Sequence, residues 1–394
     1  MKTPAAGIFS PKNASSCRRP GLYIHLPFCR SKCRYCSFYS VTSCGTIPQF
    51  IDALVREMTM YEGMFESFDT IYFGGGTPSI LSPRELETII TALRNAFAIT
   101  PDFEMTIETN PCDLTSGYAE SLRSLGFNRL SLGIQSFDNA LLSFLGRRHT
   151  SRVAEDAIIN AEKAGFENVG LDFIYGVPSQ SIISWKETLS KALSYSPSHI
   201  SCYQLTIEDA TPLGLLREKS LLHTIGDSLE YGFFMATSRT LDDAGYIHYE
   251  VSNFAKHPLL RSRHNEKYWN HTPYLGLGPS AHSFLQGRRW WNHRSLHNYM
   301  KDILAQKKPV EDDETLTMEQ LETEALFLGL RTSRGIELKE SCGFYKDDPS
   351  NSLSAVLKKL IDAGLITLES GIVAPTIKGL AVGDSLALSL LHTM

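Results

Sequence analysis

The sequence predicts an α/β protein, a partial or full parallel (β/α) barrel followed by a smaller α+β domain. From residue 20 to about residue 255, short apolar strands alternate with helix-length amphipathic stretches six times, which is typical of a parallel sheet joined by right-handed crossovers. After about residue 285 this alternation stops. We therefore expect a flexible N-terminal tail (1–20), a barrel domain (21–285) and a C-terminal domain (286–394).

The barrel strands are predicted from short runs of apolar residues between turn signals. They span Leu22–His25, Thr70–Phe73, Phe103–Thr109, Arg129–Ile134, Val169–Ile174 and His199–Ile207. Between them, apolar residues recur at intervals of three and four, which indicates amphipathic helices. Examples are Pro48–Met64, Pro83–Phe97, Ser151–Ala164 and Ile182–Leu193. In such a barrel, functional groups are expected where the strands end.

The C-terminal domain is predicted to resemble a winged helix. Thr317–Gly329 and Ser352–Ala363 have helical periodicity, and Leu365–Thr376 reads as a hairpin that turns at Ser370-Gly371. From Val310 to Met394 there are 14 acidic and 7 basic residues, a balance of 7 − 14 = −7. Because a DNA-reading wing needs positive charge, a lid or docking domain is the better interpretation.

The overall composition excludes some classes of partner. The formal net charge is −5, so the chain lacks the basic excess that phosphate backbones require, and nucleic acid is not an expected partner. No apolar run approaches the roughly 20 residues that span a bilayer. The segment Met1–Pro20 lacks the apolar core of a signal peptide. We expect a cytoplasmic protein without a transmembrane segment.

Three of the eight cysteines form a compact motif after the first predicted strand, at Cys29, Cys33 and Cys36. A structural zinc site normally uses four protein ligands, and no fourth cysteine follows at similar spacing. Three thiolates suit a cubane iron–sulfur cluster, whose fourth iron stays open to chelate S-adenosylmethionine (SAM) and pass an electron to its sulfonium. The alternative is a loop with three unligated cysteines.

The stretch Gly21-Leu-Tyr-Ile-His-Leu-Pro-Phe-Cys29, continued to Cys36, resembles the signature of radical SAM proteins. It is similar in particular to the family around oxygen-independent coproporphyrinogen III oxidase, and this similarity runs from about Gly21 to the C-terminus. The resemblance implies a barrel of radical SAM type, a C-terminal domain of the oxidase type, a 4Fe-4S cluster on the three cysteines, and SAM as a second cofactor.

A glycine run, Gly74-Gly75-Gly76-Thr77-Pro78, ends the second predicted strand. Glycines allow a backbone to approach a ligand closely, although a tight turn alone would explain such a run. The resemblance implies that Gly75, Gly76 and Thr77 hold the SAM amino group, and it adds Tyr23 on the first strand to the SAM site.

Further SAM residues are expected at the ends of the next strands. Glu108 is an acid at the end of a buried strand, where a ligand hydroxyl would satisfy it; a salt bridge or strand cap is the alternative for Glu108 and Asp172. The resemblance implies that Glu108 binds the SAM ribose, with Gln135 and Asp172 nearby. It also implies that Arg147 pairs with the methionine carboxylate, a task suited to a planar guanidinium. The adjacent Arg148 is not excluded by spacing.

One departure from the family bears on activity. The coproporphyrinogen oxidases carry a further cysteine two residues after the third, whereas this chain has Phe38. This difference argues against oxidase activity, and whether the chain is an enzyme stays open.

A second motif, His264-Asn265-Glu-Lys-Tyr268-Trp269, resembles the His-Asn-x-x-Tyr-Trp motif of the heme chaperones in this family, as do the flanking segments 246–255 and 275–284. An imidazole can ligate heme iron, while Tyr268 and Trp269 offer flat apolar faces to a porphyrin. Core packing is the alternative for such a histidine. Which histidine binds is left open, because four others lie nearby in sequence: His248, His271, His282 and His293.

The resemblance as a whole implies a heme chaperone. Such a protein binds heme and delivers it to recipient hemoproteins such as respiratory enzymes, and it needs an electron donor if SAM is cleaved. Two alternatives remain: an oxidase that decarboxylates coproporphyrinogen III to protoporphyrinogen IX, and a non-catalytic binding protein that keeps only the fold.

Overall fold

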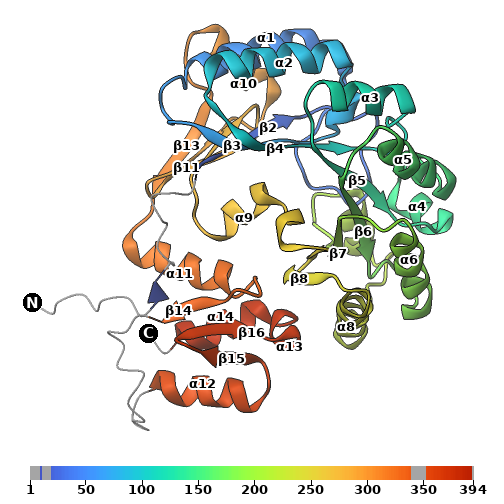
Figure 1. Cartoon of the computed structure of the whole chain (residues 1–394), viewed down its shortest axis with the longest axis vertical. Helices are drawn as coiled ribbons and strands as arrows, with labels where there is room; N and C mark the ends of the chain where they lie inside the picture. Colours follow the sequence, from blue (N-terminus) through green and yellow to red (C-terminus); the bar gives the residue numbers. More distant parts are fainter. Residues whose placement is uncertain (1–8, 11–18, 339–351, 393–394) are drawn as a thin grey trace, which may run out of the picture.

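The computed structural model describes residues 9–10, 19–338 and 352–392, and its centre is a twelve-stranded sheet. Six neighbouring strands run parallel and pair in sequence order. These are β2 (Gly21–Leu26), β3 (Phe68–Gly75), β4 (Ile99–Thr109), β5 (Arg129–Gln135), β6 (Asn168–Tyr175) and β7 (His199–Gln204). Figure 1 shows them curving into an open arc. The predicted partial barrel is therefore confirmed, with all six expected strands.

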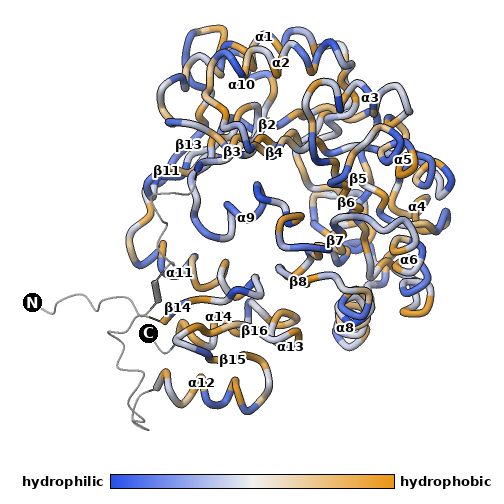
Figure 2. Tube along the Cα trace, in the orientation of Figure 1, coloured by the Kyte–Doolittle hydropathy of each residue, from blue (hydrophilic) through white to orange (hydrophobic). Residues whose placement is uncertain are grey.

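The crossover helices cover the outer side of the arc (Figure 1). They are α1 (Ile47–Thr59), α2 (Pro83–Ala96), α3 (Ser116–Ser124), α4 (Asn139–Leu145), α5 (Ser151–Lys163), α6 (Ile182–Ser194) and α8 (Asp227–Asp243). The short helix α7 (Pro212–Glu218) instead contacts the segment between Cys29 and Cys36, where the N–H of Leu213 donates to the carbonyl of Arg34 at 3.1 Å. Colour alternates along many of the crossover helices in Figure 2, as expected for helices with one apolar face. The four predicted helices are among them. A capping box of Ser82 and Glu85 fixes the start of α2.

The sheet continues beyond the parallel strands at both edges. On one side β10 (Tyr274–Leu277) runs parallel to β2 and is followed by the antiparallel strands β11 (His282–Leu285), β12 (Arg288–Asn292) and β13 (Val310–Thr315). On the other side lie β9 (Asn253–Ala255) and β8 (Ile247–Glu250). The expected division at residue 285 thus falls between two strands of one sheet. We propose that the first domain extends through β13.

The C-terminal part has its own four-stranded sheet and its own core, which includes Leu326, Leu357 and Leu390. Its elements are α11 (Met318–Gly329), β14 (Ile336–Leu338), α12 (Ser352–Asp362), β15 (Ile366–Glu369), β16 (Ile372–Pro375), α13 (Ile377–Leu380) and α14 (Gly383–Leu391). The predicted hairpin is present as β15 and β16. Ser370 and Gly371 have φ values of 50° and 78°, the left-handed pair that a tight hairpin turn requires.

Part of the expected tail belongs to this second sheet. Strand β1 (Phe9–Ser10) pairs with β14, while residues 1–8 and 11–18 lie outside the described residues. The two sheets are linked at the end of β8, where the backbone N–H of Val251 donates to the carbonyl of Arg331 at 3.0 Å. The Arg331 guanidinium lies 3.2 Å from the buried Glu250 carboxylate. No helix in the described part of the chain is long and apolar enough to cross a membrane.

Helix α9 (Arg263–Trp269) lies inside the arc (Figure 1). Its side chains contact the first residues of the barrel strands: a Cβ on Gly21 would lie 2.8 Å from Lys267 and 3.0 Å from His264. A glycine at the start of β2 therefore makes room for α9, which fills the barrel at the end where the strands begin.

A buried carboxylate, Glu57 on α1, joins that helix to the β10–β12 edge and to α10 (Leu296–Leu304). It accepts hydrogen bonds from Tyr299 Oη at 2.6 Å and from the backbone N–H of Gly278 at 2.8 Å, and Asn292 Nδ2 also donates to it. Glu57 is fully buried without a salt bridge among the described residues. Burial raises the pKa of Glu57 from 4.5 to about 7.

This shift predicts a pH-dependent stability. Because the folded state holds the Glu57 proton more tightly than the unfolded state, stability is lost as the pH rises from about 4.5 to about 7. Glu57→Gln removes that titration. We expect it to gain on the order of 2 to 3 kcal/mol relative to the wild type between pH 5 and pH 8, measured by urea unfolding. Glu62→Gln, an exposed site on the same segment, is the matched control and should leave the pH profile unchanged. Parallel profiles for wild type and Glu57→Gln would contradict the prediction.

Candidate functional site

The cysteine motif lies in a loop that follows β2 and is held in place by backbone hydrogen bonds. The N–H of Cys29 donates to Val41 at 2.9 Å, and the N–H of Arg34 donates to Leu145 at the end of α4 at 3.1 Å. The loop covers the carboxyl ends of the parallel strands, where functional groups are expected in a barrel of this kind. Cys29, Cys33 and Cys36 all line one cavity of about 490 Å³.

The same cavity brings together every residue predicted to contact SAM. Its walls include all eight of them: Tyr23, Gly75, Gly76, Thr77, Glu108, Gln135, Arg147 and Asp172. They come from six separate segments of the chain, so their convergence follows from the parallel order of the strands. Residues that the sequence did not single out also line the cavity, among them Tyr72, Arg129, Ser131, Ser201, Tyr203 and Asn265. Alternation along the strands could have indicated several of them, since Arg129 and Ser131 on β5, like Ser201 and Tyr203 on β7, alternate with buried apolar residues and so share one face of their strand.

The glycine run lies directly against the cysteine loop. A Cβ on Gly76 would lie 2.7 Å from the carbonyl oxygen of Phe28, and Gly75 has φ +106°, a conformation that side chains rarely adopt. Thr77 Oγ1 lies 3.3 Å from Cys29 Sγ. This segment therefore presents bare backbone to the cavity beside the first cysteine.

Glu108 and Asp172, two acids on the cavity wall, can each accept further hydrogen bonds. Glu108 accepts a hydrogen bond from Tyr72 Oη at 2.9 Å, and Asp172 accepts one from Ser131 Oγ at 2.6 Å. Neither forms a salt bridge within the described residues. Burial raises the pKa of Glu108 to about 7 and raises the pKa of Asp172. Because a desolvated acid gains from a hydroxyl or cationic partner, the wall is suited to a polar ligand.

The structure separates the two neighbouring arginines. Arg147 Nη2 donates to the carbonyl of Gly133 at 2.8 Å, and Nη1 lies 3.4 Å from Cys33 Sγ. Its Nε is buried with no hydrogen-bond partner in the described structure. Arg148 instead pairs with Asp113 at 3.3 Å. Arg147 is thus the guanidinium with a donor to spare beside the cysteine loop.

The donor set fits an iron–sulfur cluster better than a single ion. In the described ranges no three His, Cys, Asp or Glu side chains gather around one metal-ion position, whereas the three cysteines share a cavity wall. A cubane presents its iron atoms at separate corners, so its thiolate ligands need not converge on one point. The remaining cavity, with its bare backbone, acids and arginine, is suited to a zwitterionic ligand that carries hydroxyls.

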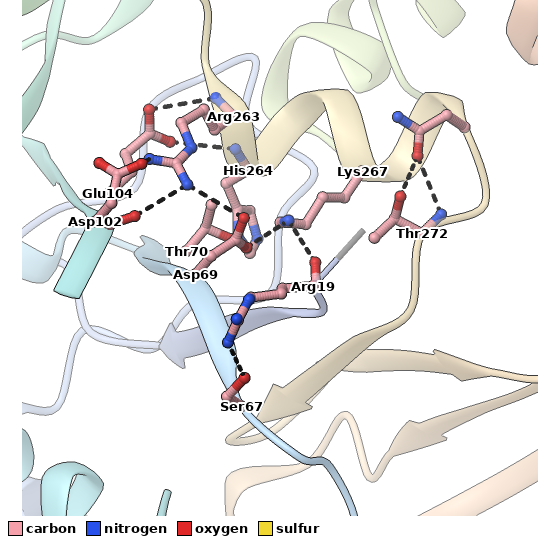
Figure 3. Close-up of polar contacts among 11 residues, drawn as sticks. Arg19, Ser67, Asp69, Thr70, Asp102, Glu104, Arg263, His264, Lys267 and Thr272 are labelled. Atoms are coloured by element: carbon pink, nitrogen blue, oxygen red, sulfur yellow. Dashed lines mark hydrogen bonds and ion pairs between the residues drawn. The ribbon is translucent and has the colours of Figure 1, made fainter. Parts of the chain in front are cut away.

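The second motif forms helix α9, which two carboxylates hold to the barrel (Figure 3). Glu104 of β4 accepts from the backbone N–H groups of Arg263 and His264 at 3.2 and 3.1 Å. Asp69 of β3 pairs with Arg263 at 3.2 Å and with Lys267 at 2.6 Å. A carboxylate at a helix N-terminus is stabilising, so α9 is fixed at both of its ends.

His264 itself is enclosed within this network. It is 1% exposed, with Nδ1 2.9 Å from Thr70 Oγ1 and Nε2 2.9 Å from Tyr268 Oη. Its ring stacks on Tyr72 with centroids 5.1 Å apart. Burial lowers the pKa of His264 to about 3, so the ring is neutral. His264, Tyr268 and Trp269 do not line the large cavity, whereas their neighbour Asn265 does. The motif forms the floor beneath the cavity.

Comparisons with known proteins agree with this geometry. The model of the radical SAM superfamily matches residues 23–192, and the model of the HemN C-terminal domain matches residues 316–382. The solved structure of coproporphyrinogen III oxidase (HemN) from Escherichia coli superposes with a TM-score of 0.79 at 22% identity, over 94% of this chain and 90% of that one. At this identity the likeness shows the fold. Fold and site together define a radical SAM protein.

Similarity to curated relatives identifies the family within this class. The heme chaperone HemW of Synechocystis is 35% identical over 80% of this chain and 78% of its own length. The HemW of Lactococcus lactis is 34% identical over 92% of this chain and 95% of its own. The mouse mitochondrial radical S-adenosyl methionine domain-containing protein 1 is 32% identical over 97% of this chain and 89% of its own. The chain belongs to the HemW family.

Proposed function

We propose that this protein is a heme chaperone, which binds heme and passes it to recipient hemoproteins such as respiratory enzymes in the cytoplasm. The observation that carries the proposal is the identity of about one third with curated heme chaperones over most of the chain. The excess of acidic over basic residues argues against a nucleic-acid partner.

The cofactor assignment is part of this proposal. Cys29, Cys33 and Cys36 would hold a 4Fe-4S cluster, and when bound this cluster supplies an electron to SAM from an external donor. Thr77 and the bare backbone of Gly75 and Gly76 would hold the amino group of SAM. Arg147 would pair with its carboxylate, and Glu108 with its ribose hydroxyls. Tyr23, Gln135 and Asp172 would line the rest of the SAM site.

An oxygen-independent coproporphyrinogen III oxidase is the second candidate, favoured by the HemN fold. The position at which those oxidases carry a further cysteine is Phe38 here, and its side chain is 68% exposed at the cavity mouth. A phenyl ring cannot ligate iron or transfer a proton, so the chemistry of that cysteine is missing. The chaperone is therefore the better interpretation.

One pair of assays distinguishes the two. Protein reconstituted anaerobically with iron and sulfide is titrated with heme, and the same preparation is incubated with coproporphyrinogen III, SAM and a reductant. We expect a saturable change in the heme absorption spectrum and no protoporphyrinogen IX. Formation of protoporphyrinogen at many turnovers, without heme binding, would establish the oxidase.

The two arginines give a direct test of the SAM site. Arg147→Ala should weaken SAM binding by about tenfold or more, because a charge-assisted bidentate contact contributes on the order of 2 kcal/mol. Arg148→Ala is the matched control. Arg148 also lines the cavity, but its guanidinium already pairs with the largely buried side chain of Asp113, so this variant should change the SAM dissociation constant by less than about threefold. Anaerobic calorimetry measures both constants, with iron content checked in each variant. Equal effects of the two changes would remove Arg147 from the site.

His264, Tyr268 and Trp269 remain the predicted heme motif. Iron ligation by His264 would require the loss of its hydrogen bond to Thr70 or to Tyr268 and an opening of α9. In the described contacts, the motif closes the end of the barrel beneath the cavity.

A further inference from the structure

A second pocket lies beside the cysteine loop, on the β10–β13 side of the sheet. It has a volume of about 340 Å³ and is lined by nine residues: Ser37, Phe38, Tyr39, Ser280, His282, Trp291, Asn292, Arg294 and Glu311. Ser37 and Phe38 also line the large cavity. The two pockets therefore adjoin across the residues that directly follow Cys36. We call the second one the rim pocket.

The rim pocket contains the one histidine with free ring nitrogens among the five considered from the sequence, within the described structure. His264 is buried, and His248 bonds through both nitrogens, to Ser238 Oγ and to the carbonyl of Val251. His271 lies 3.4 Å from Glu324, and His293 lies 3.0 Å from Asp302. His282 is exposed on β11 and has no hydrogen bond in the part of the chain described.

Two aromatic side chains flank this histidine. His282 pairs across the strands with Trp291 of β12, and the two rings stack with centroids 5.7 Å apart and planes 28° apart. Phe38 lies on the opposite segment, with 68% of its surface exposed. An exposed phenylalanine costs hydration free energy, so a flat apolar ligand that covers it is favoured.

The polar groups of the rim pocket also have capacity for a ligand. Arg294 is exposed and its guanidinium forms no ion pair within the described ranges. The acid in the pocket, Glu311, faces His293 at 3.8 Å. Asn292 is 1% exposed, and its Oδ1 lacks a partner in the described structure. A guanidinium near one edge of an aromatic pocket suits a carboxylate at the edge of the ligand.

We propose that the rim pocket is the heme site, with His282 as an axial ligand of the iron, Trp291 stacked on the His282 imidazole and holding it in place, Phe38 against a porphyrin face, and Arg294 near a propionate. This inference rests on the proposed heme-chaperone function and locates the heme-binding site in the structure. The cluster loop would then form one wall of the heme site.

Two probes test the site on the full-length, cluster-loaded protein: heme and metal-free protoporphyrin IX. His282→Ala should weaken heme binding by about tenfold or more and shift the Soret band, because an axial bond is lost. It should change protoporphyrin IX binding by less than about threefold, since stacking is retained. Phe38→Ala should weaken the binding of both probes, because it removes the aromatic face on which either porphyrin packs. His297→Ala, an exposed histidine on the adjacent α10, is the matched control and should resemble the wild type.

The outcomes are distinct. Heme binding by the wild type that is unchanged in His282→Ala, in both affinity and Soret position, overturns the rim site and leaves the chaperone function standing. If His264→Ala alone abolishes the Soret shift while circular dichroism shows an intact fold, the ligand is His264 and the inference is wrong. A wild-type protein that binds no heme overturns the chaperone function, and the rim site with it.

Discussion

Replacing Cys29, Cys33 or Cys36 with alanine abolishes retention of the iron–sulfur cluster; this is the largest functional effect that we expect. Each thiolate would supply one of three iron ligands, and no other cysteine lines the cavity in the described structure. With two thiolates left, two of the four irons lack a protein ligand. The brown absorption and the iron and sulfide content of anaerobically reconstituted protein should fall to the background level.

Cys44→Ala is the matched control. Cys44 is half-buried near the end of the same segment but outside the cavity lining, so this variant should keep its full iron content. Thermal unfolding of each cluster-free variant shows whether loss of iron reflects loss of ligands or loss of fold. Stoichiometric iron in any of the three cavity variants would refute the ligand assignment, and with it the SAM site.

Replacing Glu104 with alanine gives the largest expected loss of stability. Glu104 is 6% exposed, caps the N-terminus of α9 and lies near the fully buried Arg129, whose charge it offsets. Its removal takes away the largest charge that offsets the buried guanidinium, leaving Asp172 as the remaining carboxylate that raises the Arg129 pKa, and leaves two helix N–H groups without their acceptor. Losing a buried countercharge together with two hydrogen bonds to it costs about 3 to 5 kcal/mol, so we expect a marked fall in the thermal unfolding midpoint.

Asp102→Ala provides the control for this change, because Asp102 also contacts Arg263, at 3.5 Å, but its side chain is 97% exposed. Exposed pairs contribute about 0 to 1 kcal/mol, so the midpoint of this variant should remain near the wild-type value. The Soret response to heme is measured in parallel. If Glu104→Ala and Asp102→Ala unfold at the same temperature, α9 is not fixed by the buried carboxylate.

Local signals were sufficient to predict the barrel and its cavity. Each strand from β2 to β7 is a short apolar run, and parallel strands place their ends at one edge. The choice of Glu108, Gln135 and Asp172 as SAM residues at that edge came from the resemblance to the radical SAM family. The cysteine spacing is a local signal as well, and it indicated the cluster loop. The unpaired Nε of Arg147 then separates it from Arg148, which the sequence alone could not do.

Long-range packing could not be predicted in the same way. Nothing local to the segment 263–269 shows that Glu104 and Asp69, more than 150 residues earlier, hold it inside the barrel. His264 accordingly looked like a ligand in sequence, and its enclosure by Thr70, Tyr72 and Tyr268 depends on the tertiary fold. The strands β12 and β13 extend the large sheet through antiparallel backbone pairing, and Arg288 and Arg289 pair with acids on β13. The sequence did not show this pairing, because the alternation of strands and helices stops near residue 285.

The position of α9 also affects the order in which ligands can bind and dissociate. Because α9 fills the end of the barrel where the strands begin, small molecules would reach the cavity from the opposite end. There the cysteine loop lies between the cavity and the rim pocket. A porphyrin seated there, or a protein docked to collect it, would hinder the exchange of whatever lies deeper. If both proposed sites are correct, loading is sequential: the inner cofactor binds first and dissociates last.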